Sequence, residues 1–141
     1  MKEAFIKSIS YVTPEKAVSN EDLRKEFPEW SSNKVAEKVG IVRRFTSSIT
    51  ETTSFLAWRA AEKLFEQNNI DRGDIDLVIL CTQSPDYALP TTACLIQAKL
   101  NLKKNCGAFD FNLGCSGYIY GLAIAKGFIV SGIAENILFI T

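Results

Sequence analysis

The chain has 141 residues, and its 16 basic and 16 acidic side chains give a formal net charge of zero. This length suits one domain that buries roughly two thirds of the surface of its unfolded chain. The balanced charge, without a run of Lys or Arg, argues against a nucleic-acid partner or an anionic membrane surface. Because no signal-like segment or membrane-spanning apolar run is present, we expect a cytoplasmic protein that does not enter the membrane.

The first third of the chain shows short patterns separated by Pro, Gly and polar residues. Apolar residues before Thr13-Pro14 favour a strand, and Ser19 or Asn20 is a suitable cap for the helix that follows. The pattern predicts, in order, a strand at 5–12, a turn at 17–20, helices at 21–27 and 32–38, and an irregular or extended segment at 43–48.

The rest of the chain alternates between helical and strand-like apolar spacing. The expected elements are a helix at 52–68, a strand at 75–82, a loop at 84–90, a helix at 91–100, a strand at 106–111, a helix from 116 onward and a strand at 136–141. This alternation predicts an α/β fold with a mainly parallel sheet flanked by helices. Because nothing follows the apolar last strand to cover it, we expect an amino-terminal piece of a longer protein.

Cys115 lies where the strand-like pattern changes to a helical one. The first N–H groups of a helix carry a partial positive charge, which favours a thiolate, and the N–H of Cys115 itself is suited to binding an oxyanion. Gly114 and Gly117 leave room around the sulfur. Cys115 is therefore a candidate nucleophile, although an intracellular cysteine in an apolar setting is also commonly a small packing residue.

The other three cysteines are Cys81, Cys94 and Cys106, and they fall in apolar elements, as packing residues do. No two cysteines form a C-x-x-C pair and the chain has no histidine, so we expect no metal site. Because residues 1–141 contain no histidine, none of them can serve as a His general base for Cys115.

Four motifs resemble those of one enzyme family, in the same order. They are SNEDL at 19–23, VGIVRR at 39–44, DIDLVILCTQSPDYALPTTACLIQ at 74–97 and AFDFNLGCSGYIYGL at 108–122. Together they make the chain similar to the amino-terminal part of β-ketoacyl-acyl-carrier-protein synthase III, a thiolase-like condensing enzyme. The resemblance implies one amino-terminal thiolase-like domain over residues 1–141, an incomplete half of the two-half condensing-enzyme fold.

The resemblance also implies a reaction in fatty-acid or related acyl synthesis. Cys115 would accept an acyl group from acyl-CoA, and the acyl enzyme would condense with malonyl-acyl-carrier protein after loss of carbon dioxide. The family uses no cofactor, works as a homodimer, and places a His and an Asn in its carboxy-terminal half. Residues 1–141 alone are therefore predicted to be inactive.

Five further positions are candidate substrate contacts, each with an alternative. Leu89 matches a residue that borders the partner's acyl pocket, but an ordinary loop contact also fits. Trp30 and Lys38 stand near the family's CoA-nucleotide contacts, although Trp30 is farther from Gly40 than expected and Lys38 replaces an Arg. A core or interface position fits Trp30 equally well. Arg43 and Arg44 suit phosphate or carrier-protein contacts, or a solvated face.

Two other functions remain open at this point. One is another thiolase-like acyltransferase, such as an enzyme similar to 3-hydroxy-3-methylglutaryl-CoA synthase, which uses the same cysteine with a different acceptor. The other is a non-catalytic dimerisation module, for which an ordinary, unreactive thiol at Cys115 would be the sign.

Overall fold

The computed structural model describes residues 2–141, except for the side chains of Ser32 and Val35. The chain forms two compact units, which are described separately. The larger unit combines the residues up to Val12 with Thr53–Thr141, and the smaller unit is Thr13–Thr52.

A three-stranded parallel sheet forms the centre of the larger unit. Its strands are β3 (Leu77–Cys81), β4 (Gly107–Phe111) and β5 (Ile137–Ile140), in the order β4-β3-β5. In β3 all five residues are buried, as expected for a parallel strand with helices on both faces. The predicted α/β fold with a parallel sheet is confirmed for this unit.

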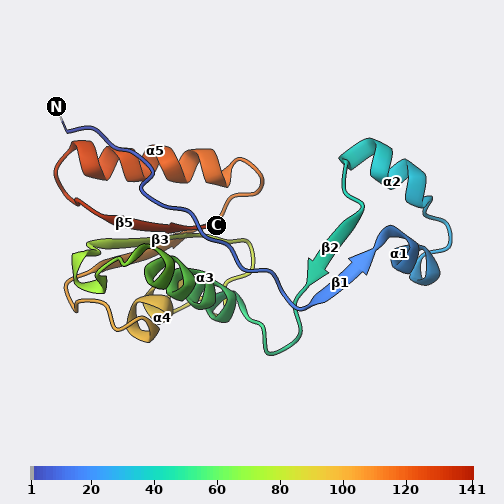
Figure 1. Cartoon of the computed structure of the whole chain (residues 1–141), viewed down its shortest axis with the longest axis horizontal. Coiled ribbons are helices and arrows are strands. Elements are labelled where there is room, and N and C mark those ends of the chain that lie inside the picture. Colours follow the sequence, from blue (N-terminus) through green and yellow to red (C-terminus); the bar gives the residue numbers. More distant parts are fainter. Residues whose placement is uncertain (1) are drawn as a thin grey trace. The chain divides into compact units, whose positions relative to one another are not determined.

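Helices cover both faces of this sheet (Figure 1). Helices α3 (Thr53–Asn68) and α4 (Thr92–Lys99) lie on one face, and α5 (Gly117–Val130) lies on the other. Side chains of β3 alternate between the two cores, since Val78 and Leu80 pack with α3 and α4 while Ile79 packs beneath α5. The short 3-10 helix η1 (Arg72–Asp74) leads into β3. No helix among the described residues combines the length and the apolar character needed to cross a bilayer.

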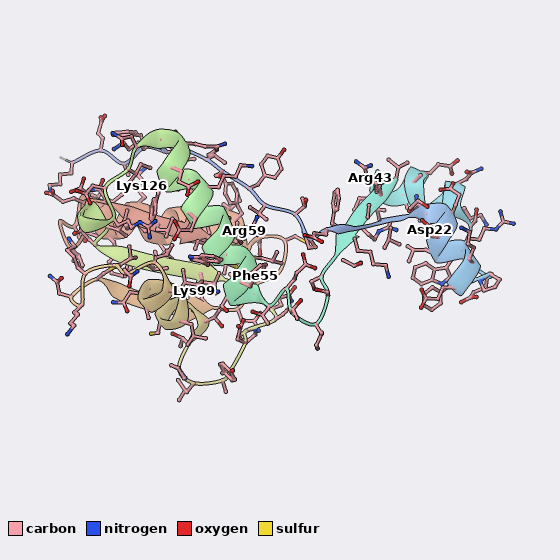
Figure 2. All side chains as sticks on the ribbon, turned by 60° about the horizontal axis from the view of Figure 1, so that its bottom comes forward. Asp22, Arg43, Phe55, Arg59, Lys99 and Lys126 are labelled. Carbon is pink, nitrogen blue, oxygen red and sulfur yellow. The ribbon has the colours of Figure 1, made fainter. Side chains whose placement is uncertain are left out.

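The outer surface of α3 and α4 carries cations placed over aromatic rings, as Figure 2 shows for Phe55, Arg59 and Lys99. The Lys99 Nζ lies 4.3 Å from the centre of the Trp58 ring and 5.3 Å from that of Phe55. The Arg59 guanidinium carbon lies 5.8 Å from the Phe55 ring centre. These cation–π contacts link the two helices across their exposed side.

The amino-terminal segment differs from its prediction. No strand is assigned in residues 2–14, and Phe5 and Ile9 are 81% and 73% exposed. The segment is held instead by the Lys63 Nζ, which donates to the Tyr11 carbonyl oxygen at 3.1 Å. The predicted strand at 5–12 is wrong for the described residues because a strand needs a neighbouring backbone, and none of the described strands pairs with this segment.

The smaller unit is built on an antiparallel pair of strands, β1 (Lys16–Ser19) and β2 (Arg43–Thr46). Strand β1 lies where a turn was predicted at 17–20, so that prediction is wrong, whereas β2 agrees with the extended alternative predicted at 43–48. The local pattern missed β1 because this strand is defined by pairing with a segment distant in sequence.

Two short helices, α1 (Asn20–Glu26) and α2 (Ser32–Val39), complete the smaller unit. The Ser19 hydroxyl accepts from the Asp22 N–H at 3.1 Å, and the Asp22 carboxylate accepts from the Ser19 N–H at 3.2 Å, which makes a capping box. Gly40 ends α2 with a φ of 68°, in the left-handed region that favours glycine. Both helices were predicted.

The carboxylate of Asp76 joins the entrance of β3 to the loop before β5. It accepts from the N–H groups of Glu135 at 2.8 Å and Asn136 at 3.0 Å, and from the Lys103 Nζ at 3.2 Å. The bonds from Asn136 and Glu135 hold the pKa of Asp76 below its usual value.

We expect Asp76→Asn to lower the free energy of unfolding by about 1 to 2 kcal/mol at pH 7, because it weakens charge-assisted bonds to backbone N–H groups. Since the folded-state pKa is lowered, this contribution is present above about pH 4 and disappears as the pH falls further. Urea unfolding of both proteins at several pH values measures it. A difference that stayed constant into acid would contradict the assignment.

Candidate active site

The candidate nucleophile lies on a tight turn between β4 and α5. The Gly114 carbonyl oxygen accepts from the Gly117 N–H at 2.8 Å, with Cys115 and Ser116 between them. Helix α5 begins at Gly117, and the Cys115 side chain is exposed. The predicted position of Cys115, between a strand and a helix, is confirmed.

The start of α5 lacks a side-chain cap. The Ser116 side chain does not cap the helix, and among residues 2–141 no acceptor is found for the N–H of Cys115. An N–H at this position is suited to stabilising negative charge on a carbonyl oxygen that the Cys115 sulfur attacks.

Two glycines allow α5 to lie very close to the sheet. A Cβ on Gly117 would be 2.3 Å from the Cys81 Sγ, and a Cβ on Gly121 would be 2.1 Å from the Phe139 Cζ. The Phe139 ring stacks with those of Phe111 and Tyr118, with ring centres 6.4 and 6.1 Å away. The turn that carries Cys115 therefore rests on a packed layer of one thiol and three rings.

The loop after β3 begins beside the Cys115 turn, because parallel strands bring their carboxyl ends to the same edge of the sheet. The Thr82 N–H donates to the Phe111 carbonyl oxygen at 3.2 Å. A Cβ on Gly114 would be 3.9 Å from the side-chain amide of Gln83. Farther along this loop, the Leu89 side chain is 81% exposed. The loop predicted at 84–90 thus presents an apolar side chain to its surroundings.

Two carboxylates hold this loop at the starts of neighbouring helices. The Asp86 carboxylate accepts from the Ser54 N–H at 2.9 Å and from the Ser54 hydroxyl at 2.6 Å, in the first turn of α3. The Asp110 carboxylate accepts from the N–H groups of Thr92 and Ala93, both at 2.7 Å, at the start of α4. Sequence reasoning missed both roles, since each carboxylate caps a helix distant from it in sequence.

Asp110→Ala is expected to lower the free energy of unfolding by about 3 kcal/mol, because it leaves two N–H groups in a buried helix start without their acceptor. Thr91, at the N-cap position, provides no side-chain bond to replace it. Chemical denaturation measures the loss.

Asp71→Ala is the matched control for Asp110→Ala. The Asp71 carboxylate also accepts from a backbone N–H, that of Gly73 at 2.7 Å, but at an exposed turn. Its removal is expected to cost no more than about 1 kcal/mol. Equal losses for the two variants would show that the buried position of the Asp110 bonds is unimportant.

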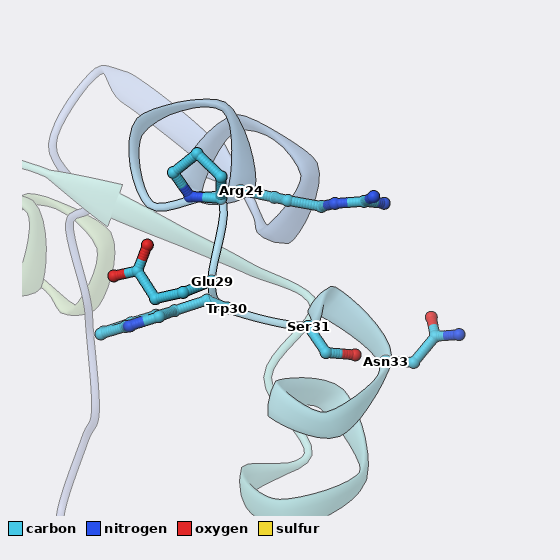
Figure 3. Close-up of a pocket in the computed structure, with 6 residues that line it drawn as sticks. Arg24, Glu29, Trp30, Ser31 and Asn33 are labelled. Atoms are coloured by element: carbon cyan, nitrogen blue, oxygen red, sulfur yellow. The ribbon is translucent and has the colours of Figure 1, made fainter.

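In the smaller unit, Trp30 helps to line a pocket of about 260 Å³. Figure 3 shows Glu29 and Trp30 on the loop between α1 and α2, with Ser31 and Asn33 at the start of α2 and Arg24 on α1. The Trp30 ring stacks on that of Phe27 with centres 5.3 Å apart, and 48% of the residue remains exposed. An exposed indole face is suited to stacking on a planar ring.

The other candidates of the smaller unit do not line this pocket. Lys38 is exposed in the last turn of α2, and the Arg43 guanidinium lies 5.4 Å from the centre of the Phe45 ring. The Arg44 guanidinium donates to the Asn20 side-chain oxygen, while the Asn20 amide donates to the Ile41 carbonyl oxygen at 2.9 Å. Arg44 thus has a partner within the fold that sequence reasoning did not foresee.

The remaining cysteines differ from Cys115 in their exposure. Cys81 and Cys106 are buried and Cys94 is half-buried. Burial raises the pKa of the Cys106 thiol, so this group stays protonated at neutral pH. Within residues 2–141, no three metal-binding side chains come together.

Known proteins are similar to the chain in both sequence and fold. The family profile described as 3-oxoacyl-[acyl-carrier-protein (ACP)] synthase III matches residues 109–141. The β-ketoacyl-[acyl-carrier-protein] synthase III of Clostridium perfringens is 43% identical over 140 residues, which are 99% of this chain and 42% of that protein. The chain thus spans about two fifths of the length of this relative.

Solved structures give the same result. A crystal structure of a 3-oxoacyl-(acyl-carrier-protein) synthase III has a TM-score of 0.90 and 43% identity, covering 98% of this chain and 41% of the other. The 3-oxoacyl-[acyl-carrier-protein] synthase III of Aquifex aeolicus has a TM-score of 0.82 and 36% identity, covering 92% and 41%. The fold expected from the motifs is confirmed.

Proposed function

We infer that the chain belongs to the 3-oxoacyl-[acyl-carrier-protein] synthase III enzymes, which have the thiolase-like fold, and that it forms the amino-terminal part of such an acyltransferase. The proposed function of the full-length protein is to join an acyl group from acyl-CoA to malonyl-acyl-carrier protein. The observation that carries this proposal is the exposed Cys115 on the turn before α5.

The first proposed step transfers the acyl group to Cys115. The thiolate sulfur attacks the thioester carbonyl carbon of acyl-CoA, and the Cys115 N–H donates to the oxyanion that forms. When the oxyanion collapses, the bond to the CoA sulfur breaks, and CoA leaves as a thiolate that takes up a proton. The product is an acyl thioester on Cys115, and the step uses no cofactor.

The second proposed step forms the carbon–carbon bond. Malonyl-acyl-carrier protein loses carbon dioxide, and the electrons left on its α-carbon attack the acyl carbonyl of Cys115. The bond to the Cys115 sulfur breaks, which releases 3-oxoacyl-carrier protein and regenerates the thiolate. Because residues 1–141 contain no histidine, the proposal assigns a His and an Asn from the rest of the protein to this step.

The substrate contacts are also proposals. The pocket at Trp30 is assigned to the CoA nucleotide, with Lys38, Arg43 and Arg44 as candidate contacts for phosphate or the carrier protein. The bond from Arg44 to Asn20 supports a structural role for this residue as well. Leu89 is proposed to border the acyl pocket of the partner in a cytoplasmic homodimer, and its exposure supports this role.

Mass spectrometry of the full-length protein tests the function. After incubation with acetyl-CoA, we expect an acetyl group on the peptide that contains Cys115 and none on the peptides with the other cysteines. Addition of malonyl-acyl-carrier protein should remove it and yield the 3-oxoacyl product. Removal by acetyl-CoA alone would instead indicate the other acyltransferase class, and absence of the adduct would overturn the proposal.

A further inference from the structure

The buried Cys81 lies directly beneath the turn that carries the candidate nucleophile. We propose that Cys81 is a positioning residue, which fixes the geometry of this turn and thereby the reactivity of Cys115. The inference rests on the proposed function only in taking Cys115 as the reacting group.

Cys81 contacts the turn on both sides of Cys115. Its thiol donates to the Leu113 carbonyl oxygen with a sulfur–oxygen distance of 3.6 Å, two residues before Cys115. Its sulfur also packs against Gly117, two residues after Cys115, where any Cβ would come within 2.3 Å. The same side chain therefore holds the end of the β4 loop and the first residue of α5.

The strand beneath makes this contact rigid. Cys81 is the last residue of β3, in which all five residues are buried, and it pairs in register with Phe111 of β4. Because neighbours in β3 alternate between the faces, Cys81 points to the α5 side, as Ile79 does. A thiol is small and polarisable, so it fills the space that Gly117 leaves while still offering a weak donor.

Removal of the thiol should act on Cys115 through the helix start. In Cys81→Ala the Leu113 carbonyl loses its donor and α5 loses the atom against which Gly117 rests. The loop end at Leu113 and the first residue of α5 would then be held less firmly on either side of Cys115, so its sulfur would meet a reagent in a less fixed geometry. A thiol that only filled the core would change stability without changing Cys115.

The experiment measures alkylation of Cys115 by iodoacetamide in the full-length protein, from pH 5 to pH 9 or so, with peptide mass spectrometry to identify the modified cysteine. For Cys81→Ala we expect the rate at pH 7 to fall at least about threefold. Cys81→Ser, which keeps a donor of similar size, should recover part of the rate. It also serves as the test variant if the alanine variant does not fold.

Cys106→Ala is the matched control, since Cys106 is buried to the same degree as Cys81, at 5% and 6% exposure, but lies just before the start of β4, whereas Cys81 is the last residue of β3. The urea concentration at which half of the Cys106→Ala protein is unfolded should fall, while the rate of Cys115 alkylation at each pH stays that of the original protein. The inference is overturned if Cys81→Ala, or Cys81→Ser in its place, leaves that profile unchanged, or if Cys106→Ala shifts it equally.

Failure of the proposed function would be recognised separately. Alkylation requires no acyl-CoA and no carrier protein, so a shifted profile without any acetyl adduct would support the role of Cys81 and reject the condensing reaction. An acetyl adduct on Cys115, together with an unshifted profile in the Cys81 variants, would support acyl transfer to Cys115 and reject the role of Cys81.

Discussion

Replacement of Cys115 by serine is expected to lower acyl transfer from acyl-CoA by at least about 10³-fold while leaving the fold intact. A serine hydroxyl is not ionised near neutral pH, whereas a cysteine thiol ionises far more readily and is the stronger nucleophile. The side chain is exposed on the turn, so exchange of sulfur for oxygen costs little packing. The release of free CoA from acetyl-CoA by the full-length protein measures the loss.

Cys94→Ala provides the comparison for this variant. Cys94 is half-buried, and its sulfur accepts from the Thr91 hydroxyl at 3.3 Å, away from the turn. Acyl transfer by Cys94→Ala should stay within about twofold of the original rate, since the loss of one sulfur atom away from the Cys115 turn has a small effect. If Cys115→Ser kept a tenth of the original rate, the nucleophile would have to be another group.

Among substitutions that add one methyl group to α5, Gly121→Ala should be the most damaging, with an expected loss of about 3 kcal/mol in the free energy of unfolding. The added Cβ would be 2.1 Å from Cζ and 2.4 Å from Cε2 of Phe139. This ring cannot move freely, because the rings of Phe111 and Tyr118 both stack with it. The helix must therefore shift away from the sheet, which also moves the turn at Cys115.

A second glycine of the same helix supplies the control for Gly121→Ala. A Cβ on Gly127 meets no atom within 4 Å, so Gly127→Ala should stabilise by about 0.8 kcal/mol through helix propensity alone. Adding Phe139→Leu to Gly121→Ala should restore part of the lost stability by making room for the methyl group. Thermal and urea unfolding give all three values, and similar effects at the two glycines would disprove the close approach.

The elements that sequence reasoning predicted best are those defined by their own local pattern. The continuous apolar run around β3 indicated a central parallel strand, and every residue of β3 is buried. The change of spacing at Cys115 placed the turn between β4 and α5, where the structure has it. In both cases neighbouring residues alone carry the signal.

The features that sequence reasoning missed depend on partners distant in the sequence. The segment at 5–12 has the apolar pattern of a strand but no described strand beside it, while Lys16–Ser19 has a turn-like pattern yet pairs with Arg43–Thr46. Asp110 appeared as a lone acid in an apolar strand, and only the fold brings it to the start of α4. For the same reason the position of Cys81 beneath Gly117 could not be predicted.

The chain has two tryptophans, and each unit contains one of them: Trp30 stacks on Phe27 in the smaller unit, and Trp58 lies beneath Lys99 in the larger one. Indole fluorescence responds to the surroundings of the ring, so in a chain of residues 1–141 Trp30→Phe leaves an emission that reports only on the larger unit, and Trp58→Phe leaves one that reports only on the smaller. Coincident melting curves for the two variants would identify a single cooperative transition, whereas separate curves would give each unit its own unfolding free energy.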